Sequence, residues 1–217
     1  SPSLVYGFGE TRGTAVVDTS GNARNGTFRG TVTKNAGSCV ADATPFVTLN
    51  GSSGYISTAT QFNSPRNITV AMWFKTASAR GGTLIGFGDT QTGTPAASDR
   101  HIYLTNAGRL VFGAAPGGTP TTITSSAGYN DSRWHHVAAS LGSTGMRLYV
   151  DGAQVAANAA VTTGRSQLGY FRVGNGTLSG WPDAPTSPFF GGSVDGVGVY
   201  GSELPASSIA AQYSAKR

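Results

Sequence analysis

Short runs of alternating apolar and polar residues, separated by turn residues, extend along almost the whole chain. In residues 134–141, for example, Val137 and Leu141 fall on one face of a strand, and His136 and Ser140 fall on the other. A period of two is typical of half-buried β-strands. The pattern predicts strands at residues 4–8, 14–17, 26–28, 46–49, 55–57, 68–76, 82–87, 101–104, 109–112, 121–124, 135–141, 146–150, 153–157, 169–173 and 192–200.

Turn sequences and one helical segment complete the pattern. The segment Gly142-Ser143-Thr144-Gly145 predicts a hairpin turn, because glycine accepts the positive φ angles that such turns require. Residues 205–213 predict a helix whose first turn suits a proline. About ten residues per strand is typical of an all-β, two-sheet antiparallel jelly-roll sandwich. No linker divides the chain, so we expect a single domain over residues 1–217.

The composition disfavours several classes of partner. Only 12% of the residues are charged, so Ser, Thr, Asn and Gly must cover the surface, which is common in secreted proteins. The net charge of +5 reflects the scarcity of acidic residues, and the arginines are scattered without a basic run, so we expect no nucleic-acid binding. No apolar run of about 18 residues occurs, so we expect no membrane insertion. The single cysteine, Cys39, is expected to be a buried thiol.

Five segments in order carry a resemblance to a known family. The strongest is SRWHHVAASLGSTGMRLYVDGAQVA at residues 132–156, and the others are residues 4–30, 45–58, 68–76 and 191–213. Together they resemble the laminin-G-like, concanavalin A-like jelly-roll family. Residues 99–113, 126–136 and 169–182 are similar to a carbohydrate-binding type found in secreted bacterial proteins and polysaccharide-degrading enzymes. The resemblance implies binding of sugars or proteins without catalysis, although a fold alone does not fix a function.

The first loop and the closing strand together suggest a metal site. Asp18, Asn22 and Asn25 share a Gly- and Asn-rich loop, and their oxygens are ligands that calcium prefers. One carboxylate is too few, and Asp195, in an otherwise apolar strand, needs a cation or hydrogen bonds. The resemblance implies the same link, and we therefore expect a structural calcium ion. The alternative is an Asx-turn in which Asp18 caps its own loop and Asp195 accepts backbone N–H bonds.

Three segments combine aromatic rings with polar groups, as sugar-binding surfaces do. Residues 169–182 end on Trp181, which a Gly/Pro loop is expected to present with its face outward. Residues 99–103 lie where a loop enters a strand, and residues 129–131 border both segments. We predict a ligand site formed by Asp99, Arg100, His101, Tyr129, Asn130, Tyr170, Arg172 and Trp181.

Each of these residues has a structural alternative. Trp181 packs within its own loop in one alternative, and Arg100 or Arg172 forms an ion pair with Asp99 or Asp183 in another. Trp73 and Trp134 are assigned to the core, because each lies in a strongly apolar or alternating strand. His135 and His136 point to opposite faces of one strand, so they are not expected to converge on one metal ion or substrate atom.

The acidic residues argue against catalysis. A glycosidase needs two carboxylates a few ångströms apart, yet Glu10 lies in a predicted turn and Glu203 lies beside the predicted helix. His101 and Tyr103 are the nearest counterpart of a lyase pair, without the other motifs of such enzymes. The leading hypothesis is a non-catalytic carbohydrate-binding module of a larger secreted polysaccharide-degrading or cell-surface protein. We expect it to be monomeric, joined to other domains and specific for a polysaccharide or oligosaccharide. An adhesion or spacer domain is the alternative, followed by a hydrolase or lyase.

Overall fold

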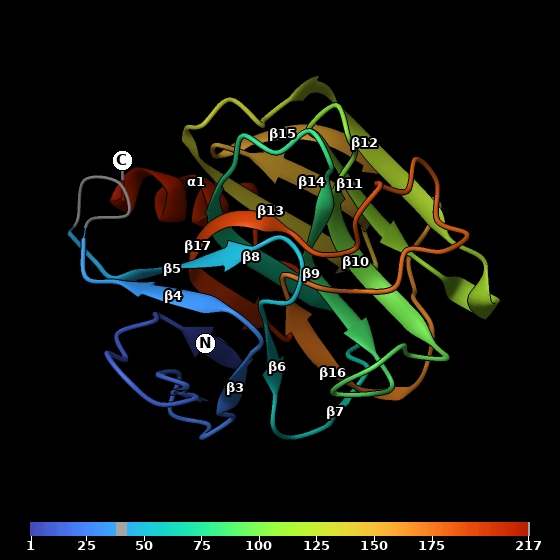
Figure 1. The fold of residues 1–217 in the computed structure, drawn as a ribbon. Coiled ribbons are helices and arrows are strands. Elements are labelled where there is room, and N and C mark those ends of the chain that lie inside the picture. Colours follow the sequence, from blue (N-terminus) through green and yellow to red (C-terminus); the bar gives the residue numbers. More distant parts are fainter. Residues whose placement is uncertain (38–42, 217) are drawn as a thin grey trace.

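The strands form two layers that face each other. The computed structural model describes residues 1–37 and 43–216, and Cys39 lies outside these residues. In the described residues the strands form two antiparallel sheets, and one α-helix lies near the C-terminal end (Figure 1). The two-sheet jelly-roll sandwich with a short C-terminal helix that the sequence predicts is confirmed. No helix in the described part of the chain is long and apolar enough to cross a membrane.

Sheet A carries the helix on its outer face. Among the described residues its paired strands follow the order β15 (Ala153–Asn158), β14 (Gly145–Val150), β13 (Trp134–Gly142), β8 (Ile68–Lys75), β17 (Gly191–Tyr200), β5 (Phe46–Asn50) and β4 (Val32–Asn35), with β1 (Leu4–Tyr6) paired to β17. Helix α1 (Ala206–Ala215) packs Ile209 against Ala71 and Ala138 on this face. The indole of Trp73 stacks on Tyr213 of the helix at 5.7 Å between ring centroids.

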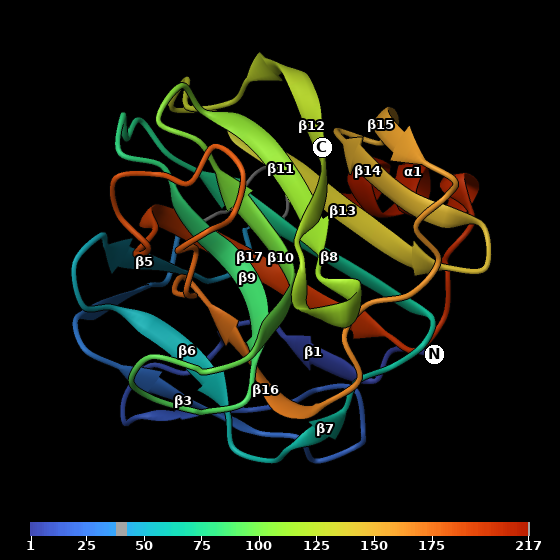
Figure 2. The ribbon, with the colours of Figure 1, turned by 90° about the vertical axis from the view of Figure 1, so that its right-hand side faces the viewer.

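Sheet B forms the opposite layer. Its order among the described residues is β12 (Thr121–Gly128), β11 (Arg109–Ala114), β10 (Ser98–Leu104), β9 (Gly82–Gly88), β16 (Leu168–Val173), β6 (Tyr55–Thr58), β3 (Gly26–Arg29) and β2 (Ala15–Val16), with β7 (Phe62–Asn63) paired to β16. A short 3-10 turn, η1 (Pro116–Gly118), joins β11 to β12. Figure 2 shows β9, β10 and β11 side by side in this layer.

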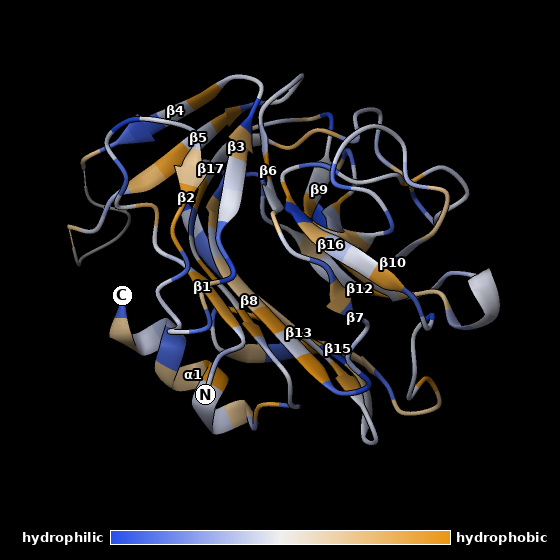
Figure 3. Ribbon diagram, turned by 90° about the horizontal axis from the view of Figure 1, so that it is seen from below, coloured by the Kyte–Doolittle hydropathy of each residue, from blue (hydrophilic) through white to orange (hydrophobic). Residues whose placement is uncertain are grey.

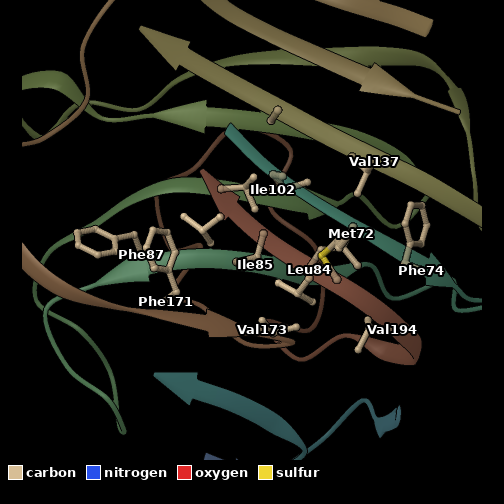
Figure 4. Close-up of a cluster of buried hydrophobic side chains, with 14 of the residues drawn as sticks. Met72, Phe74, Leu84, Ile85, Phe87, Ile102, Val137, Phe171, Val173 and Val194 are labelled. Carbon is tan, nitrogen blue, oxygen red and sulfur yellow. The ribbon is translucent and has the colours of Figure 1, made fainter. Parts of the chain in front are cut away.

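The hydrophobic core lies between the sheets. Inward-facing side chains of both layers meet there, including Met72 from β8 and Phe87 and Phe171 from β9 and β16 (Figure 4). Hydrophobic residues concentrate in the strands of both layers (Figure 3). One core cluster contains residues from Leu4 to Val199. Burial of each large apolar side chain stabilises the fold by about 1.5–3 kcal/mol.

Three details of the sequence prediction are corrected. Strands β4 and β7 lie outside the predicted strands, because β4 is a half-exposed edge strand with a weakly apolar pattern and β7 has only two residues. Trp134, expected in the core, is only half-buried at the start of β13. It meets the ring of Phe46 edge-on at 5.3 Å instead of entering the space between the sheets.

His135 and His136 point to opposite faces of β13, as predicted. His136 packs against Trp73 on the helix side, with ring centroids 5.3 Å apart. His135 lies between two carboxylates, with Nδ1 2.7 Å from Asp151 Oδ2 and Nε2 3.0 Å from Asp131 Oδ1. Burial alone would lower the pKa of His135, but hydrogen bonding and attraction to Asp151 and Asp131 outweigh burial and raise it.

His135 is therefore expected to make the stability depend on pH. Its raised pKa lets the folded chain hold a proton that the unfolded chain releases above the ordinary value of 6.5. The added free energy of unfolding is fully present below that value, and it is lost as the pH rises through the raised pKa. Burial lowers the pKa of His101 and His136 to about 4, so these two groups make the folded chain more stable as the pH rises from about 4 to 6.5 and add little change above neutral pH.

Urea titrations between about pH 5 and 9 measure this dependence. We expect the free energy of unfolding to decline above neutral pH in the original chain and to change little there in His135→Gln. An equal decline in both proteins would show that His135 is not the responsible group.

Candidate functional site

A pocket of about 530 Å³ opens on the outer side of sheet B. Strands β6 and β16 contribute to it, together with the loop between β9 and β10 and the loop of residues 174–190, which joins β16 to β17. Its volume lies within the range of small-molecule sites. The lining residues are Tyr55, Gly93, Thr94, Arg172, Asn175, Gly176, Thr177, Leu178, Ser179, Ala184, Pro185, Pro188 and Phe189.

Arg172 holds one wall of this pocket. It points outward from β16, because its neighbours Phe171 and Val173 face the core. Its guanidinium donates to the Thr90 carbonyl oxygen from Nε at 3.0 Å and from Nη2 at 2.7 Å, and from Nη1 to the Gly93 carbonyl oxygen at 2.8 Å. Burial lowers the pKa of Arg172, although a guanidinium stays charged at physiological pH. Arg172 lies at the predicted ligand site, but its side chain is 2% exposed and it supports the pocket wall.

Two aromatic rings provide apolar surface in the pocket. Tyr55 and Phe189 are half-buried, and their ring centroids are 6.3 Å apart at an interplanar angle of 59°. The guanidinium carbon of Arg172 lies 5.8 Å from the centre of the Tyr55 ring. The pocket therefore combines rings, a fixed cation and the amide of Asn175.

The loop of residues 174–190 is fixed at both ends and near its tip. Its base is closed by the Phe190 N–H, which donates to the Gly174 carbonyl oxygen at 3.0 Å. Near the tip, the Thr186 N–H donates to Asn106 Oδ1 at 2.9 Å, and Asn106 Nδ2 donates to Thr186 Oγ1 at 2.7 Å. These bonds hold the pocket wall in place without a ligand.

The expectation that Trp181 faces outward is wrong. Its side chain is 7% exposed and packs with Tyr103 and Val111 on the outer face of sheet B. The His101 ring lies edge-on to the indole, with centroids 4.7 Å apart. Space for the indole exists because residue 113 is glycine: a Cβ there would lie 2.5 Å from Trp181 Cζ3. Trp181 is buried because its loop packs on the outer face of sheet B and covers the apolar side chains there.

Asp99, Arg100 and His101 are also buried, contrary to a direct binding role. Asp99 is 0% exposed and pairs with Arg100, so the ion-pair alternative applies to them. Asp99 Oδ1 accepts the Ala115 N–H at 2.6 Å, and its Oδ2 accepts the Arg165 N–H at 3.0 Å. Burial raises the pKa of Asp99, against the lowering effect of the Arg100 charge. These residues position loops rather than contact a ligand in the 530 Å³ pocket.

Tyr129, Asn130 and Tyr170 do not line this pocket either. Tyr129 lies edge-on to His135 at 5.0 Å, and Asn130 Nδ2 donates to the Ser78 carbonyl oxygen at 3.1 Å. Tyr170 is half-buried on β16. Of the predicted ligand residues, only Arg172 reaches the pocket.

Sequence reasoning missed Tyr55 and Phe189 as pocket residues. Tyr55 opens a strand 117 positions before Arg172, and only the pairing of β6 with β16 places them together: Arg172 lies opposite Ser57. For Phe189 the sequence contains a signal of exposure, because a second phenylalanine, Phe190, follows it directly. One of two neighbouring rings must turn away from the core, and here Phe190 is 0% exposed.

The loop expected to bind calcium is organised by hydrogen bonds. Asp18 Oδ1 accepts the N–H groups of Val5 and Ser20, each at 2.9 Å. Its Oδ2 accepts Ser20 Oγ–H and the Arg24 N–H, each also at 2.9 Å. Burial would raise the pKa of Asp18, but these donors outweigh burial and lower it. This is the Asx-turn alternative for Asp18.

Asn22, Asn25 and Asp195 are engaged elsewhere. Asn25 Oδ1 accepts the Asp18 N–H at 2.9 Å, and Asn22 Nδ2 donates to the Pro2 carbonyl oxygen at 3.1 Å. Asp195 forms an ion pair of 2.8 Å with Lys216 of the C-terminal segment. The described residues contain no group of three or more His, Cys, Asp or Glu side chains that fits a metal ion. Asp18 and Asp195 thus have separate partners, and the described donor set does not fit calcium.

The pocket also offers no acid–base pair. None of its lining residues in the described chain is a carboxylate or a histidine. His101 and Tyr103, the lyase-like pair, are 1% and 0% exposed beneath Trp181. The described lining of this pocket therefore lacks the pair of carboxylates that a glycosidase needs.

The burial of Trp181 predicts a structural effect of its removal. We expect Trp181→Ala to lower the free energy of unfolding by about 3–5 kcal/mol, because it leaves a cavity against Tyr103 and Val111. Urea denaturation is the measurement, and Tyr170→Ala, a half-buried ring on the same sheet, is the control. A loss below about 1 kcal/mol would contradict a structural role.

Because hydrogen bonds already organise the Asp18 loop, we expect the folded chain to be stable without calcium. Asp18→Asn places an amide against donors that need an acceptor, and we expect it to destabilise the chain by about 1–3 kcal/mol. Asp183→Asn, at an exposed position, is the matched control. Added calcium and added EDTA should both leave the melting temperature of the original chain unchanged. A calcium-dependent rise that Asp18→Asn abolishes would restore the metal site.

Comparisons with known proteins agree with this architecture. The binding domain of botulinum neurotoxin serotype G has a TM-score of 0.72 at 12% identity, covering 99% of this chain and 51% of that one. The binding domain of botulinum neurotoxin DC in complex with rat synaptotagmin II gives 0.71 at 15%, covering 100% and 52%. The same domain in complex with SialylT gives 0.70 at 16%, with the same coverage.

These identities show a likeness of fold alone, and this chain spans about half the length of the solved structures it matches. A comparison with curated protein sequences found no match. The family model described as the concanavalin A-like lectin/glucanases superfamily, a laminin-G model, matches residues 50–210. The match covers most of the chain, and the chain therefore belongs to the concanavalin A-like lectin/glucanases superfamily.

Proposed function

We propose that this chain is a non-catalytic carbohydrate-binding module that binds a polysaccharide or oligosaccharide in the 530 Å³ pocket. The observation that carries the proposal is the pair of half-buried rings, Tyr55 and Phe189, in a pocket that also includes Asn175 and whose Gly93 wall is held by Arg172. An aromatic face suits the apolar C–H face of a sugar ring, and neighbouring polar groups bond its hydroxyls. We therefore propose that Tyr55 and Phe189, rather than Trp181, provide the aromatic surface that contacts the sugar ring.

Preorganisation supports binding at this pocket. Arg172 is tied to Thr90 and Gly93, and the opposite loop is tied to Asn106. A ligand then loses little free energy to ordering of the walls. Because the described lining of the pocket lacks carboxylates and histidines, we propose that another part of a larger protein carries out any cleavage of polysaccharide.

The comparisons are compatible with a secreted binding domain. The superfamily name refers to lectins and glucanases, and one similar solved structure is a toxin binding domain in complex with SialylT. We propose that this chain belongs to a larger secreted polysaccharide-degrading or cell-surface protein and is monomeric.

Substitution of Tyr55 tests the pocket. We expect Tyr55→Ala to weaken polysaccharide binding about tenfold or more, because contact with one aromatic ring is worth about 1.5–3 kcal/mol. Affinity gel electrophoresis against a panel of neutral and acidic polysaccharides is the measurement. Tyr170→Ala removes a ring of equal size on the same sheet, outside the pocket, and should bind like the original chain.

Three outcomes would overturn the proposal. Equal losses in Tyr55→Ala and Tyr170→Ala would place the site elsewhere. Absence of binding across the panel, together with capture of a protein receptor, would favour the adhesion alternative. Turnover of polysaccharide by the isolated chain would instead favour an enzyme.

A further inference from the structure

The 530 Å³ pocket continues into two smaller ones. A pocket of about 280 Å³ shares Thr177 and Ser179 with it, and that second pocket also includes one edge of Trp181. A third pocket of about 230 Å³ shares Arg165 with the second. The three pockets are therefore neighbours along one path, which we call the arginine groove. A series of adjoining pockets suits a ligand made of several linked units.

The arginine groove carries cations without acids in its lining. The accessible cations are Arg66, which is exposed in the third pocket, and Arg165, which is half-buried between the second and third pockets. Arg172 and Arg100 also line the groove, but they are only 2% and 3% exposed, and Arg100 is paired with Asp99. No Asp or Glu of the described chain lines any of the three pockets. Serine, threonine and asparagine supply the other polar groups: Ser64, Thr94, Ser98, Thr163, Ser166, Asn175, Thr177 and Ser179.

The buried Asp99–Arg100 pair holds two of these cations in place. A register shift follows Asp99 in β10, and Arg100 has a φ of 52°, a left-handed conformation that non-glycine residues rarely adopt. From there Arg100 Nη2 donates to the Pro65 carbonyl oxygen at 2.8 Å, and Nη1 donates to the Arg165 carbonyl oxygen at 3.1 Å. The same side chain thus fixes the segments that carry Arg66 and Arg165.

The nearby carboxylates leave Arg66 and Arg165 available to a ligand. Asp99 is taken up by Arg100 and by the N–H groups of Ala115 and Arg165. Asp89, near Arg172, accepts the Ala96 N–H at 3.0 Å. Within the described residues, no ion pair involves Arg66 or Arg165.

We propose that the arginine groove binds an acidic polysaccharide, with Arg165 and Arg66 receiving its carboxylate or sulfate groups. This inference rests on the proposed function and adds the chemical class of the ligand. Guanidinium groups form paired hydrogen bonds with planar anions, and such charge-assisted bonds are stronger than those to neutral hydroxyls. Asp99 and Arg100 then act as positioning residues.

Substitution of the two arginines tests this inference on the full chain. The probes are polygalacturonate, dextran sulfate and neutral dextran, each measured by affinity gel electrophoresis and titration calorimetry. We expect Arg165→Gln to weaken binding of an acidic polymer about tenfold and Arg66→Gln to weaken it less, because Arg66 is more exposed. Preference for polygalacturonate or dextran sulfate separates carboxylate from sulfate recognition.

The control variant is Arg147→Gln, which removes the same charge from β14 in the other sheet. It should change affinity less than about twofold, since exposed charges at a distance are screened. Unchanged melting temperatures would exclude misfolding, because Arg165 contacts Asp99 and Arg100 through its backbone alone.

Failure of this inference is distinguishable from failure of the proposed function. If Tyr55→Ala weakens binding while Arg165→Gln changes neither acidic nor neutral affinity, the acidic ligand is wrong and the pocket stands. If Arg147→Gln matches Arg165→Gln, the attraction is nonspecific and the inference is overturned. If none of these polymers nor any other polysaccharide binds, both proposals fall.

Discussion

The burial of Trp181 on the outer face of sheet B is the contact on which the candidate site depends. The loop of residues 174–190 contributes most of the pocket lining, and such a long loop needs an anchor to hold one conformation. Trp181 supplies that anchor by packing against Tyr103 and Val111, in the space left by Gly113. With the indole fixed, Asn175 and Phe189 reach their positions around Arg172 on either side of it. The residue expected to contact the ligand instead builds the site.

The few acidic residues organise loops in this protein. Asp18, Asp99 and Asp151 each accept backbone N–H groups, and Asp195 accepts the N–H of Gly196 at 2.6 Å. A carboxylate that accepts several N–H bonds satisfies groups that would otherwise be buried without partners. Hydrogen bonds of this kind take the structural place that calcium was expected to fill at Asp18.

This use of carboxylates explains the character of the surface. The chain has 15 Lys and Arg residues against 10 Asp and Glu residues. Most of the described carboxylates accept backbone N–H groups, and within the described part of the chain no ion pair involves Arg66 or Arg165. These two arginines lie beside pockets that are rich in hydroxyl groups.

The sequence by itself determined the two-sheet architecture, the helix near residues 205–213 and the opposite orientations of His135 and His136. These follow from local periodicity, which fixes the face of each side chain on its own strand. The burial of Trp181 and the ion pair of Asp195 with Lys216 were decided by tertiary structure alone. Periodicity does not state what covers the outer face of a sheet or which distant strand lies alongside. The nearness of Tyr55 to Arg172 arises only when β6 pairs with β16.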